Sequence, residues 1–400
     1  MKYVKRILDY ADKNDLYPDM KIIDGPAEPE VFIDGRKVLM FSSNNYLGLS
    51  NHPKVIESAI AGIKEYGVGS DGSRLLSGNI KIHREFEKAI AKFKGGEDAI
   101  VWPTGYAANL GTISALMNPF KVGPQDFLRF KGVIISDELN HASIIDGAKL
   151  SKQIKAKYKH RDMTDLESQL KRYKWRRKLI VTDSVFSMDG DIAPLDKIAE
   201  LKKKYNAMLM IDEAHATGIL GKTGHGSLEH FGLRTGKDVD IVLGTCSKAL
   251  AATGGFVVGD RDLVRFLRVA SRSYMFSTAM MPAASAALIK ALEIIETEPQ
   301  HRIRLLENSD YLRNSFHELG FDTLTSQTQI IPILIGDDRK AIAFSRRLLE
   351  EGIFGPNVRW PAVEKNKARI RFTVMATHTK EQMNKLLNAC KTIKKELNLT

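Results

Sequence analysis

The sequence predicts an α/β fold, in which a mainly parallel central sheet is sandwiched by helices and is followed by a smaller C-terminal α/β domain. Three observations predict it. Short runs that are apolar on both faces alternate with helical periods through most of the chain. A chain of 400 residues exceeds what one hydrophobic core usually organises. The last part of the chain changes to a helix and strand layer of its own.

The N-terminal segment, residues 1–45, is predicted to hold a helix and a hairpin. The run MKYVKRILDYADKNDLYP is charged throughout and lacks the apolar core of a signal peptide. The run EVFIDGRKVLMF follows, and its Asp34 and Gly35 supply the turn chemistry of a β-hairpin. We expect the large domain to start directly afterwards.

Residues 46–298 are predicted to form this large domain around a parallel sheet. Its strands are apolar on both faces and helices lie between most of them, as in sheets covered on both sides. The predicted strands are residues 99–102, 132–137, 154–158, 178–183, 207–212, 240–243 and 255–258. Residues 117–133 carry two prolines and mixed polarity, which predicts an extended surface loop.

Residues 299–400 are predicted to form the small C-terminal domain. A helical pattern over residues 282–313 breaks near Pro299, which marks the boundary. The strand IIPILI, a helix over residues 339–351, the strand ARIRFTVM and a closing amphipathic helix over residues 380–397 follow.

Composition and charge narrow the class of protein. Hydrophobic residues at 43% and charged residues at 27% are ordinary for a soluble globular protein. The net charge of +12 is compatible with nucleic acid, a membrane surface or a polyanionic small substrate. The basic runs carry no zinc-ligand spacing and no RNA-binding signature, so they indicate a solvated face or attraction of a phosphorylated carrier such as coenzyme A.

The compartment is predicted from cysteine usage and hydropathy. The two cysteines, Cys246 and Cys390, suggest neither a disulfide framework nor a metal site. No run approaches the roughly 18 apolar residues that a membrane-spanning helix needs. We therefore expect a cytoplasmic protein with no membrane span and no nucleic-acid partner.

An acid and an amine follow two of the predicted strands. The strand AMLMID ends in Asp212, and the strand IVLGT ends just before Cys246-Ser247-Lys248. The carboxyl ends of parallel strands face the ligand crevice. Pyridoxal phosphate (PLP) needs such a pair, because a carboxylate keeps its ring nitrogen protonated and a desolvated lysine attacks its aldehyde. Taken alone, an aspartate at a strand end is more often a structural cap.

A phosphate site is predicted beside this pair. Thr104, Gly105 and Tyr106 begin a helix directly after a strand, so their backbone N–H groups are placed to bind the cofactor phosphate. Thr245 and Ser247 flank the lysine closely enough to reach the same phosphate. A plain N-cap threonine is the alternative interpretation of this helix start.

Three further polar residues are candidates for contact with the cofactor ring. His141, in DELNHASIIDG, is expected to lie flat against the ring. Ser187, in TDSVFSMDG, and His215, in DEAH, are expected to hydrogen-bond the phenolic oxygen. Each of them alone would fit a structural role, so the prediction depends on the constellation.

An arginine clamp is predicted on the strand ARIRF. Its alternation places Arg369 and Arg371 on the same face, and a planar guanidinium orients a substrate carboxylate bidentately. The residues alone leave either arginine as the clamp, and a solvent-facing basic strand as the alternative.

Several motifs together resemble the α-oxoamine synthases of the fold-type I PLP enzymes. They are SSNNYLGLSNHP, GSRLLSG, NHASIIDG, TDSVFSMDGDIAPL, DEAHATGILG and GTCSKALAATGGF. The resemblance runs in order from about Tyr17 to the C-terminus. It implies a C-acyltransferase that condenses an amino acid with an acyl thioester, loses carbon dioxide and forms an α-amino ketone. It also implies a homodimer with active sites at the subunit interface.

The resemblance also assigns roles to residues. Lys248 would carry the cofactor as a Schiff base and move the α-proton, Asp212 would pair with the ring nitrogen, and His141 would stack on the ring. The other implied contacts are His215 and Ser187 to the phenolic oxygen, Asn44 and Arg371 to the substrate carboxylate, and Ser277 and Thr278 to the phosphate of the neighbouring subunit.

Members of this family differ in their acyl partner. Arg359, in NVRWPAV, stands where 8-amino-7-oxononanoate synthases carry an arginine within IRPP, and it is placed to meet the distal carboxylate of a pimeloyl thioester condensed with L-alanine. Trp360 departs from that motif. The segments around Lys248 and Asn44 look closer to serine palmitoyltransferase. Glycine C-acetyltransferase, a decarboxylase or aminotransferase, and a non-catalytic scaffold stay open, as does the carrier, coenzyme A or an acyl carrier protein.

Overall fold

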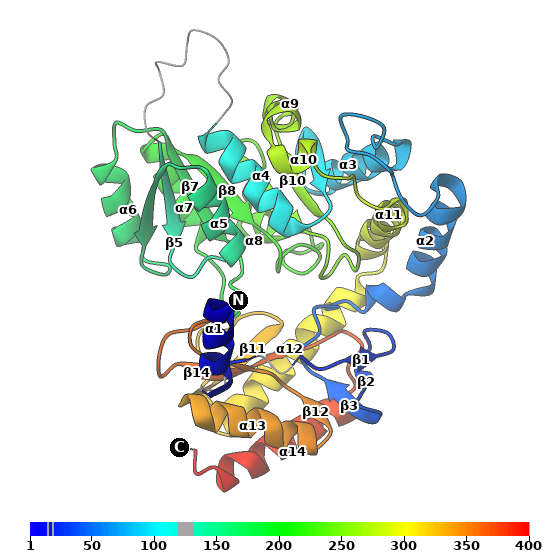
Figure 1. Ribbon diagram of the computed structural model, residues 1–400, viewed down its shortest axis with the longest axis vertical. Coiled ribbons are helices and arrows are strands. Elements are labelled where there is room, and N and C mark those ends of the chain that lie inside the picture. The colour runs from blue at the N-terminus through cyan, green and yellow to red at the C-terminus, as the bar shows by residue number, and fades with distance from the viewer. Residues whose placement is uncertain (14–15, 18–19, 119–131, 400) are drawn as a thin grey trace.

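The computed structural model describes residues 1–13, 16–17, 20–118 and 132–399. A seven-stranded sheet with its helices forms the larger part of the molecule, which occupies the upper half of Figure 1. The smaller part, below it, contains strands from both ends of the chain. Among the described helices, none combines the length and apolar character needed to cross a membrane.

The central sheet confirms the predicted strands. Its order is β4-β10-β9-β8-β7-β5-β6, with β10 antiparallel to both neighbours and the remaining pairs parallel. The strand bounds are β4 Asp98–Trp102, β5 Val133–Asp137, β6 Ile154–Tyr158, β7 Lys178–Asp183, β8 Met208–Asp212, β9 Ile241–Thr245 and β10 Gly255–Gly259. The sheet is thus mainly parallel, as expected, because the parallel strands are joined through helices on its faces.

Helices cover both faces of the sheet. Successive residues of each strand enter two different apolar clusters; Leu209 and Ile211 pack on one side and Met210 on the other. The helices are α2 Pro53–Tyr66, α3 Lys81–Phe93, α4 Gly105–Met117, α5 Ala142–Leu150, α6 Met163–Arg172, α7 Leu195–Lys204, α8 Ser227–Phe231, α9 Arg261–Ala270, α10 Arg272–Met275 and α11 Pro282–Thr297, with the 3₁₀ turn η1 at Leu49–Asn51.

The smaller part pairs the N-terminal segment with the C-terminal region. One sheet has the order β11-β14-β13 and the other the order β1-β2-β3-β12, in which β3 and β12 are parallel. The bounds are β1 Ile23–Asp24, β2 Glu30–Ile33, β3 Arg36–Met40, β11 Ile330–Gly336, β12 Ile353–Phe354, β13 Asn357–Val358, β14 Ala368–Thr373, α12 Gln300–Glu318, α13 Asp338–Glu350 and α14 Lys380–Glu396. We propose that residues 1–45 and 299–400 act as one small domain against the large domain of residues 46–298.

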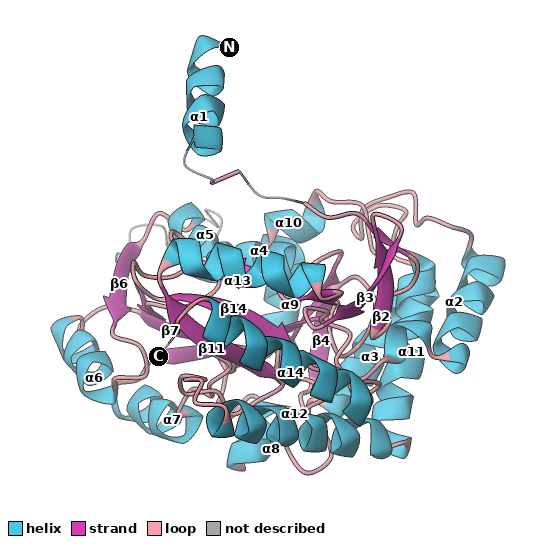
Figure 2. Cartoon of the chain, turned by 90° about the horizontal axis from the view of Figure 1, so that it is seen from below, coloured by secondary structure: helices cyan, strands magenta, loops and turns pink. Residues whose placement is uncertain are grey.

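Two local predictions concern the N-terminal segment. Asp34 and Gly35 have φ values of 51° and 73° and form the tight turn between β2 and β3. Helix α1, Lys2–Lys13, projects from the body of the molecule and contains no buried residue (Figure 2).

The predicted loop of residues 117–133 lies mostly outside the described residues; α4 ends at Met117 and β5 begins at Val133.

Candidate active site

Most of the predicted site residues surround one cavity of about 480 Å³ at the carboxyl ends of the central strands. We call it the first cavity. The predicted residues that line it are Asn44, Thr104, Gly105, Tyr106, His141, Ser187, Asp212, His215, Thr245, Ser247, Lys248 and Arg371. Segments far apart in the sequence therefore meet at the crevice that the sheet topology provides.

Two acids lie side by side at the base of this cavity. Asp212 ends β8, and Asp183 is its register partner at the end of β7. Asn109 donates to one carboxylate oxygen of Asp212 at 2.8 Å and the Ala214 N–H donates to the other at 2.9 Å. Burial, and then the charge of Asp212, raise the pKa of Asp183 well above its usual value. The pair thus keeps the Asp212 carboxylate oriented, while Asp183 is shifted toward its neutral form.

His141 is held beside these acids at the start of α5. Its backbone N–H donates to Asp183 at 2.8 Å, and its Nδ1 lies 2.7 Å from the Ser143 hydroxyl. Burial lowers the pKa of His141, although the nearby Asp212 opposes the shift. The imidazole is consequently favoured in its neutral form, with its orientation fixed through one ring nitrogen.

Lys248 follows β9 and reaches the cavity from a tight turn. The turn is closed by the Ala251 N–H, which donates to the Lys248 carbonyl at 2.9 Å, and Ala251 has a φ of 68°. Burial lowers the pKa of Lys248, while Asp212 and Asp183 act in the opposite direction. Desolvation of the amine therefore promotes the uncharged, nucleophilic form.

The start of α4 forms the predicted anion site. The Thr104 hydroxyl accepts a hydrogen bond from the Ala107 N–H at 3.1 Å, and the N–H groups of Gly105 and Tyr106, at the first two positions of the helix, have no partner within it. A Cβ on Gly105 would lie 2.7 Å from the Thr245 Cβ, so this approach requires glycine. The Thr245 and Ser247 hydroxyls lie 2.9 Å apart beside it. Backbone and hydroxyl donors therefore converge where a phosphate can bind.

The opposite wall carries the predicted substrate contacts. His215 Nδ1 lies 2.8 Å from the Tyr46 hydroxyl, which in turn lies 2.9 Å from the Asn44 side-chain oxygen. Burial holds the pKa of His215 well below its usual value. Arg371 lines the cavity and donates from Nε to the Ser187 carbonyl. The site thus joins the N-terminal segment, the large domain and β14.

The choice between the two arginines of β14 follows from their partners. Arg369 forms an ion pair with Asp189 at 2.6 Å and lines a different cavity, whereas Arg371 lines the first one. Both side chains point to the same face, as the alternation predicted. Arg371 is therefore the better placed carboxylate clamp.

A second cavity of about 920 Å³ adjoins the first and shares Met188 with it. Its walls come from the segment after β5 and from the segment between β13 and β14. Trp360, Lys365 and Lys367 contribute to one wall, and Lys157 and Glu138 to another. Its lining therefore mixes apolar surface with charges of both signs.

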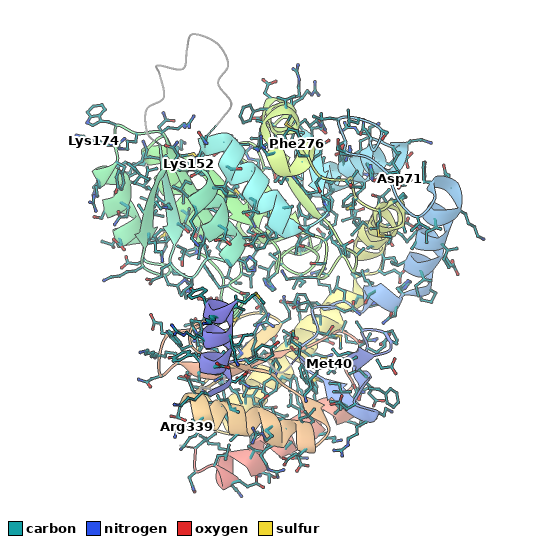
Figure 3. All side chains as sticks on the ribbon, in the orientation of Figure 1. Met40, Asp71, Lys152, Lys174, Phe276 and Arg339 are labelled. Carbon is teal, nitrogen blue, oxygen red and sulfur yellow. The ribbon has the colours of Figure 1, made fainter. Side chains whose placement is uncertain are left out.

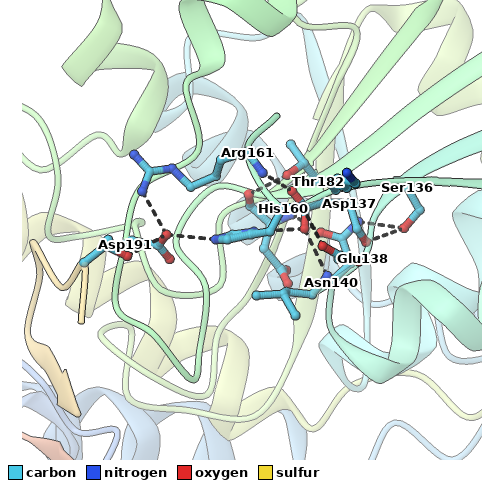
Figure 4. Close-up of polar contacts among 12 residues, drawn as sticks. Ser136, Asp137, Glu138, Asn140, His160, Arg161, Thr182 and Asp191 are labelled. Carbon is cyan, nitrogen blue, oxygen red and sulfur yellow. Dashed lines mark hydrogen bonds and ion pairs between the residues drawn. The ribbon is translucent and has the colours of Figure 1, made fainter. Parts of the chain in front are cut away.

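A partly buried histidine braces the loop between the two cavities (Figure 4). His160 Nδ1 lies 3.0 Å from Asp137 at the end of β5, and Nε2 lies 2.9 Å from Asp191 in the loop that also carries Ser187. Arg161 adds a contact to Asp191 at 3.0 Å. Although burial acts against it, the hydrogen bonds to the two carboxylates raise the pKa of His160 to about 9.

Three predicted residues lie away from the first cavity. Arg359 lines neither of the two cavities, although its neighbour Trp360 lines the second. Ser277 and Thr278 lie beyond α10, and Thr278 is exposed and bridges to Ser73. Their predicted contact with a neighbouring subunit stays a prediction.

Sequence reasoning missed several residues of the first cavity and its surroundings. Asp183, Asn109 and Ser143 line it, and Tyr46 lies behind Asn44 and His215. A signal existed for Asp183, because the strand KLIVTD ends in an acid as AMLMID does. No comparable pattern marks Asn109, which lies in the middle of α4.

Comparisons with known proteins agree with this geometry. Residues 36–390 match the family model for aminotransferase class I and II. An 8-amino-7-oxononanoate synthase from Thermoanaerobacter pseudethanolicus is 44% identical over 402 residues, covering 100% of this chain and 98% of the relative. The chain belongs to the aminotransferase class I and II family. A putative 8-amino-7-oxononanoate synthase from Acetivibrio thermocellus is 49% identical over 368 residues, 92% of each chain.

Solved structures place the chain in the α-oxoamine synthase group of that family. Serine palmitoyltransferase from S. paucimobilis, solved with a bound adduct of PLP and myriocin, superposes with a TM-score of 0.91 at 30% identity and covers 99% of this chain and 98% of its own. An 8-amino-7-oxononanoate synthase from Francisella tularensis gives 0.77 at 27% identity, covering 90% and 99%. The chain is thus a PLP-dependent acyltransferase with the fold-type I architecture, which confirms the predicted fold, family and cofactor.

The first cavity fits PLP on its own chemistry. An anion site that only glycine permits lies at one end, a fixed carboxylate lies at the end of β8, and an amine with a lowered pKa lies at the end of β9. As an α-oxoamine synthase, the enzyme uses an amino acid and an acyl thioester.

Proposed function

We propose that this α-oxoamine synthase condenses L-alanine with a pimeloyl thioester and loses carbon dioxide, as an 8-amino-7-oxononanoate synthase. The observation that carries the choice of acyl group is the charged lining of the second cavity, in which Lys157, Lys365 and Lys367 stand beside the acids Glu138 and Glu364, while Asp189 is paired with Arg369. These cations suit a short acyl chain that ends in a carboxylate. A long apolar chain would have to bury hydrocarbon against charged groups, at an unfavourable desolvation cost.

The residues of the first cavity would hold PLP, which supplies an electron sink for charge at the α-carbon of the amino acid. Lys248 would be its covalent attachment point and Asp212 the partner of its ring nitrogen. The phosphate would bind at Thr104, Gly105, Tyr106, Thr245 and Ser247, the ring would lie against His141, and the phenolic oxygen would meet His215 and Ser187.

The chain's own groups orient the substrate and move its proton. Arg371 binds the carboxylate of the amino acid, with Asn44 beside it, and this fixes the α-carbon next to Lys248. The Lys248 amine, whose pKa is lowered by burial, removes the α-proton and later returns a proton to the product. The new carbon–carbon bond forms to the thioester carbonyl as the thiol leaves, and carbon dioxide is released.

The second cavity is the proposed route for the thioester. It meets the first cavity at Met188, so an acyl group that enters there reaches the α-carbon. The lysines in its walls also attract the phosphates of a coenzyme A or carrier-protein thiol. Comparing pimeloyl coenzyme A with the pimeloyl carrier protein, by kcat/KM, distinguishes the two donors.

A homodimer with shared sites is part of the proposal. Leu76 and Phe276 are 84% and 68% exposed, and they lie beside the segment that carries Ser277 and Thr278 (Figure 3 labels Phe276). Exposed apolar side chains of this size suit a subunit interface. Mixing Lys248→Ala with Thr278→Ala subunits should restore activity, since one hybrid site keeps both residues. A mixture no more active than its parents would contradict shared sites. The cytoplasmic location stays a prediction.

One assay tests the reaction. The purified enzyme is offered L-alanine, L-serine, glycine or L-threonine with pimeloyl, palmitoyl or acetyl thioesters, and the amino ketone is identified by mass spectrometry. We expect the highest kcat/KM for L-alanine with the pimeloyl thioester. The high TM-scores with serine palmitoyltransferases make L-serine with a palmitoyl thioester the second candidate. A preference for that pair would overturn the proposal.

A further inference from the structure

Two histidines and a glutamate converge where the large part of the molecule joins the small one. His52 directly precedes α2, Glu298 follows the last residue of α11, and His301 lies in the first turn of α12. Their ligand atoms all lie within 4.8 Å of one another, and within the described part of the chain no other three histidine, cysteine or acidic side chains are so arranged. The catalytic cavity uses none of them.

The distances suit a shared ion better than direct hydrogen bonds. Glu298 Oε2 lies 3.9 Å from His52 Nε2 and 3.6 Å from His301 Nε2. Hydrogen bonds would require about 2.7–3.2 Å, whereas two ligands of a tetrahedral zinc ion, each about 2.0–2.1 Å from the metal, lie roughly 3.3 Å apart. Completing such a site requires these two distances to shorten by roughly 0.3–0.6 Å and the two imidazoles, whose ligand atoms lie within 4.8 Å of each other, to move toward the ion.

The carboxylate is already oriented toward both imidazoles. Lys54 binds one oxygen, Oε1, at 2.7 Å, and the other, Oε2, accepts a long hydrogen bond from Gln300 Nε2 at 3.3 Å and is the oxygen closest to the two imidazole Nε2 atoms. Such an outer contact orients a metal ligand.

We propose that His52, Glu298 and His301 form a binding site for one divalent zinc ion, with water in the fourth position. Two imidazoles and a carboxylate are a donor set that zinc prefers, and the three side chains keep 17%, 21% and 24% of their surfaces exposed, which leaves access for the ion and its water.

A bound ion would join the start of α2 to the α11–α12 junction. Helix α2 packs along α11, and α12 packs on β11 in the sheet that carries Arg371. The ion therefore restrains the connection through which the small domain is held against the large one. It binds the folded chain and not the separated segments, so it stabilises the native state. This role is independent of the proposed acyl group.

The test is a titration of chelator-treated, PLP-loaded enzyme with Zn²⁺ by calorimetry, repeated with Co²⁺ as an absorbance probe. We expect one ion per chain. His52→Ala, Glu298→Gln and His301→Ala should each weaken binding by at least about tenfold. His230→Ala, which removes an exposed histidine outside the cluster, should leave binding unchanged.

Thermal unfolding gives a second readout. Zn²⁺ should raise the unfolding midpoint of the wild-type enzyme and of His230→Ala, and it should leave that of His301→Ala unchanged. Retained visible absorbance of bound PLP shows that each variant is folded; Glu298→Gln preserves the side-chain shape if an alanine variant does not fold. Absence of saturable binding to the wild type, or unchanged binding in the three cluster variants, would overturn the site.

Discussion

The two cavities differ in what builds them. The first is made from strand ends and the start of α4, and its acids and histidines are fixed by hydrogen bonds within the chain, such as Asn109 to Asp212 at 2.8 Å. The second is made largely from connecting segments, including residues 360–367, and its lysines lie at the surface. The sheet therefore fixes the cofactor chemistry, whereas the connections decide which acyl group is accepted.

The electrostatic consequences also differ. In the first cavity burial lowers the pKa values of Lys248 and His215 and raises that of Asp183. Such opposed shifts within one crevice are typical of a catalytic site. The second cavity offers exposed cations, whose contribution to binding is small and is screened by salt. Changes in the first cavity should consequently affect turnover, and changes in the second should affect substrate choice.

Removing the amine should have the largest effect. Lys248→Ala deletes the group that moves the α-proton, and loss of a general base costs roughly 10²–10⁴-fold in kcat. The same variant should lose the visible absorbance of lysine-bound PLP. Lys197→Ala, an exposed lysine on α7, is the control and should match the wild type. A Lys248→Ala enzyme that kept its colour and turnover would show that another group carries the cofactor.

The next largest effects should come from the two acids of the first cavity, and their substitution should lower kcat to different extents. Asp212→Asn removes the partner of the ring nitrogen, whose pKa a carboxylate raises by roughly 1–3 units, so kcat should fall roughly 10–1000-fold. Asp183→Asn should cost much less, because burial and Asp212 raise the Asp183 pKa and the amide can still accept the His141 N–H. Steady-state rates with saturating L-alanine measure both. Equal losses would mean that the acids act as one unit.

The contrast between buried strands and connecting segments also explains how much of the fold the sequence predicts. The central strands are recognisable because runs such as KLIVTD are buried on both faces and therefore apolar throughout. The reversal of β10 is not recognisable, since GFVVG is equally apolar in either direction. The pairing of β3 with β12 joins residues far apart in the chain, and strands of two or five residues carry no signal for such a partner.

The candidate site, like the fold, is predictable from the sequence only in part. Lys248, Asp212 and the start of α4 follow strand ends, so their position in the sequence predicts their position in the crevice. Asn109 lies on a helix and Tyr46 in the segment that follows β3. The local sequence pattern does not predict that their side chains reach the cavity and its surroundings. Arg359 was predicted from its motif position, yet Trp360, Lys365 and Lys367 line the second cavity and Arg359 does not.

The contacts of His160 between the two cavities predict that the stability of the fold depends on pH. The folded-state pKa of His160 is raised to about 9, above its ordinary value of 6.5, so its contribution to stability is complete below about pH 6.5 and is lost as the pH rises through 9. The loss amounts to up to about 3 kcal/mol. Urea unfolding of the wild type from pH 6 to 10 should show this decline.

Two matched variants test whether His160 causes this dependence on pH. His160→Gln should be less stable at pH 6 and should show a flatter profile, because it removes the titrating bridge between Asp137 and Asp191. His230→Gln, an exposed control, should retain the wild-type slope. Parallel profiles for the wild type and His160→Gln would assign the pH dependence to other groups.

The surface lysines of the second cavity should give the smallest effect, and it should appear in a different constant. Lys365→Met and Lys367→Met each remove one exposed cation, and an exposed ion pair contributes roughly 0.2–1 kcal/mol, so KM for the pimeloyl thioester should rise about 1.4–5-fold. Both kcat and KM for L-alanine should stay constant, because the first cavity is unchanged. Lys174→Met, which changes an exposed lysine that lines neither cavity, controls for net charge (Figure 3). If added salt abolishes the difference in KM between the variants and the wild type, the lysines act through charge; a fall in kcat would instead show that the two cavities are coupled.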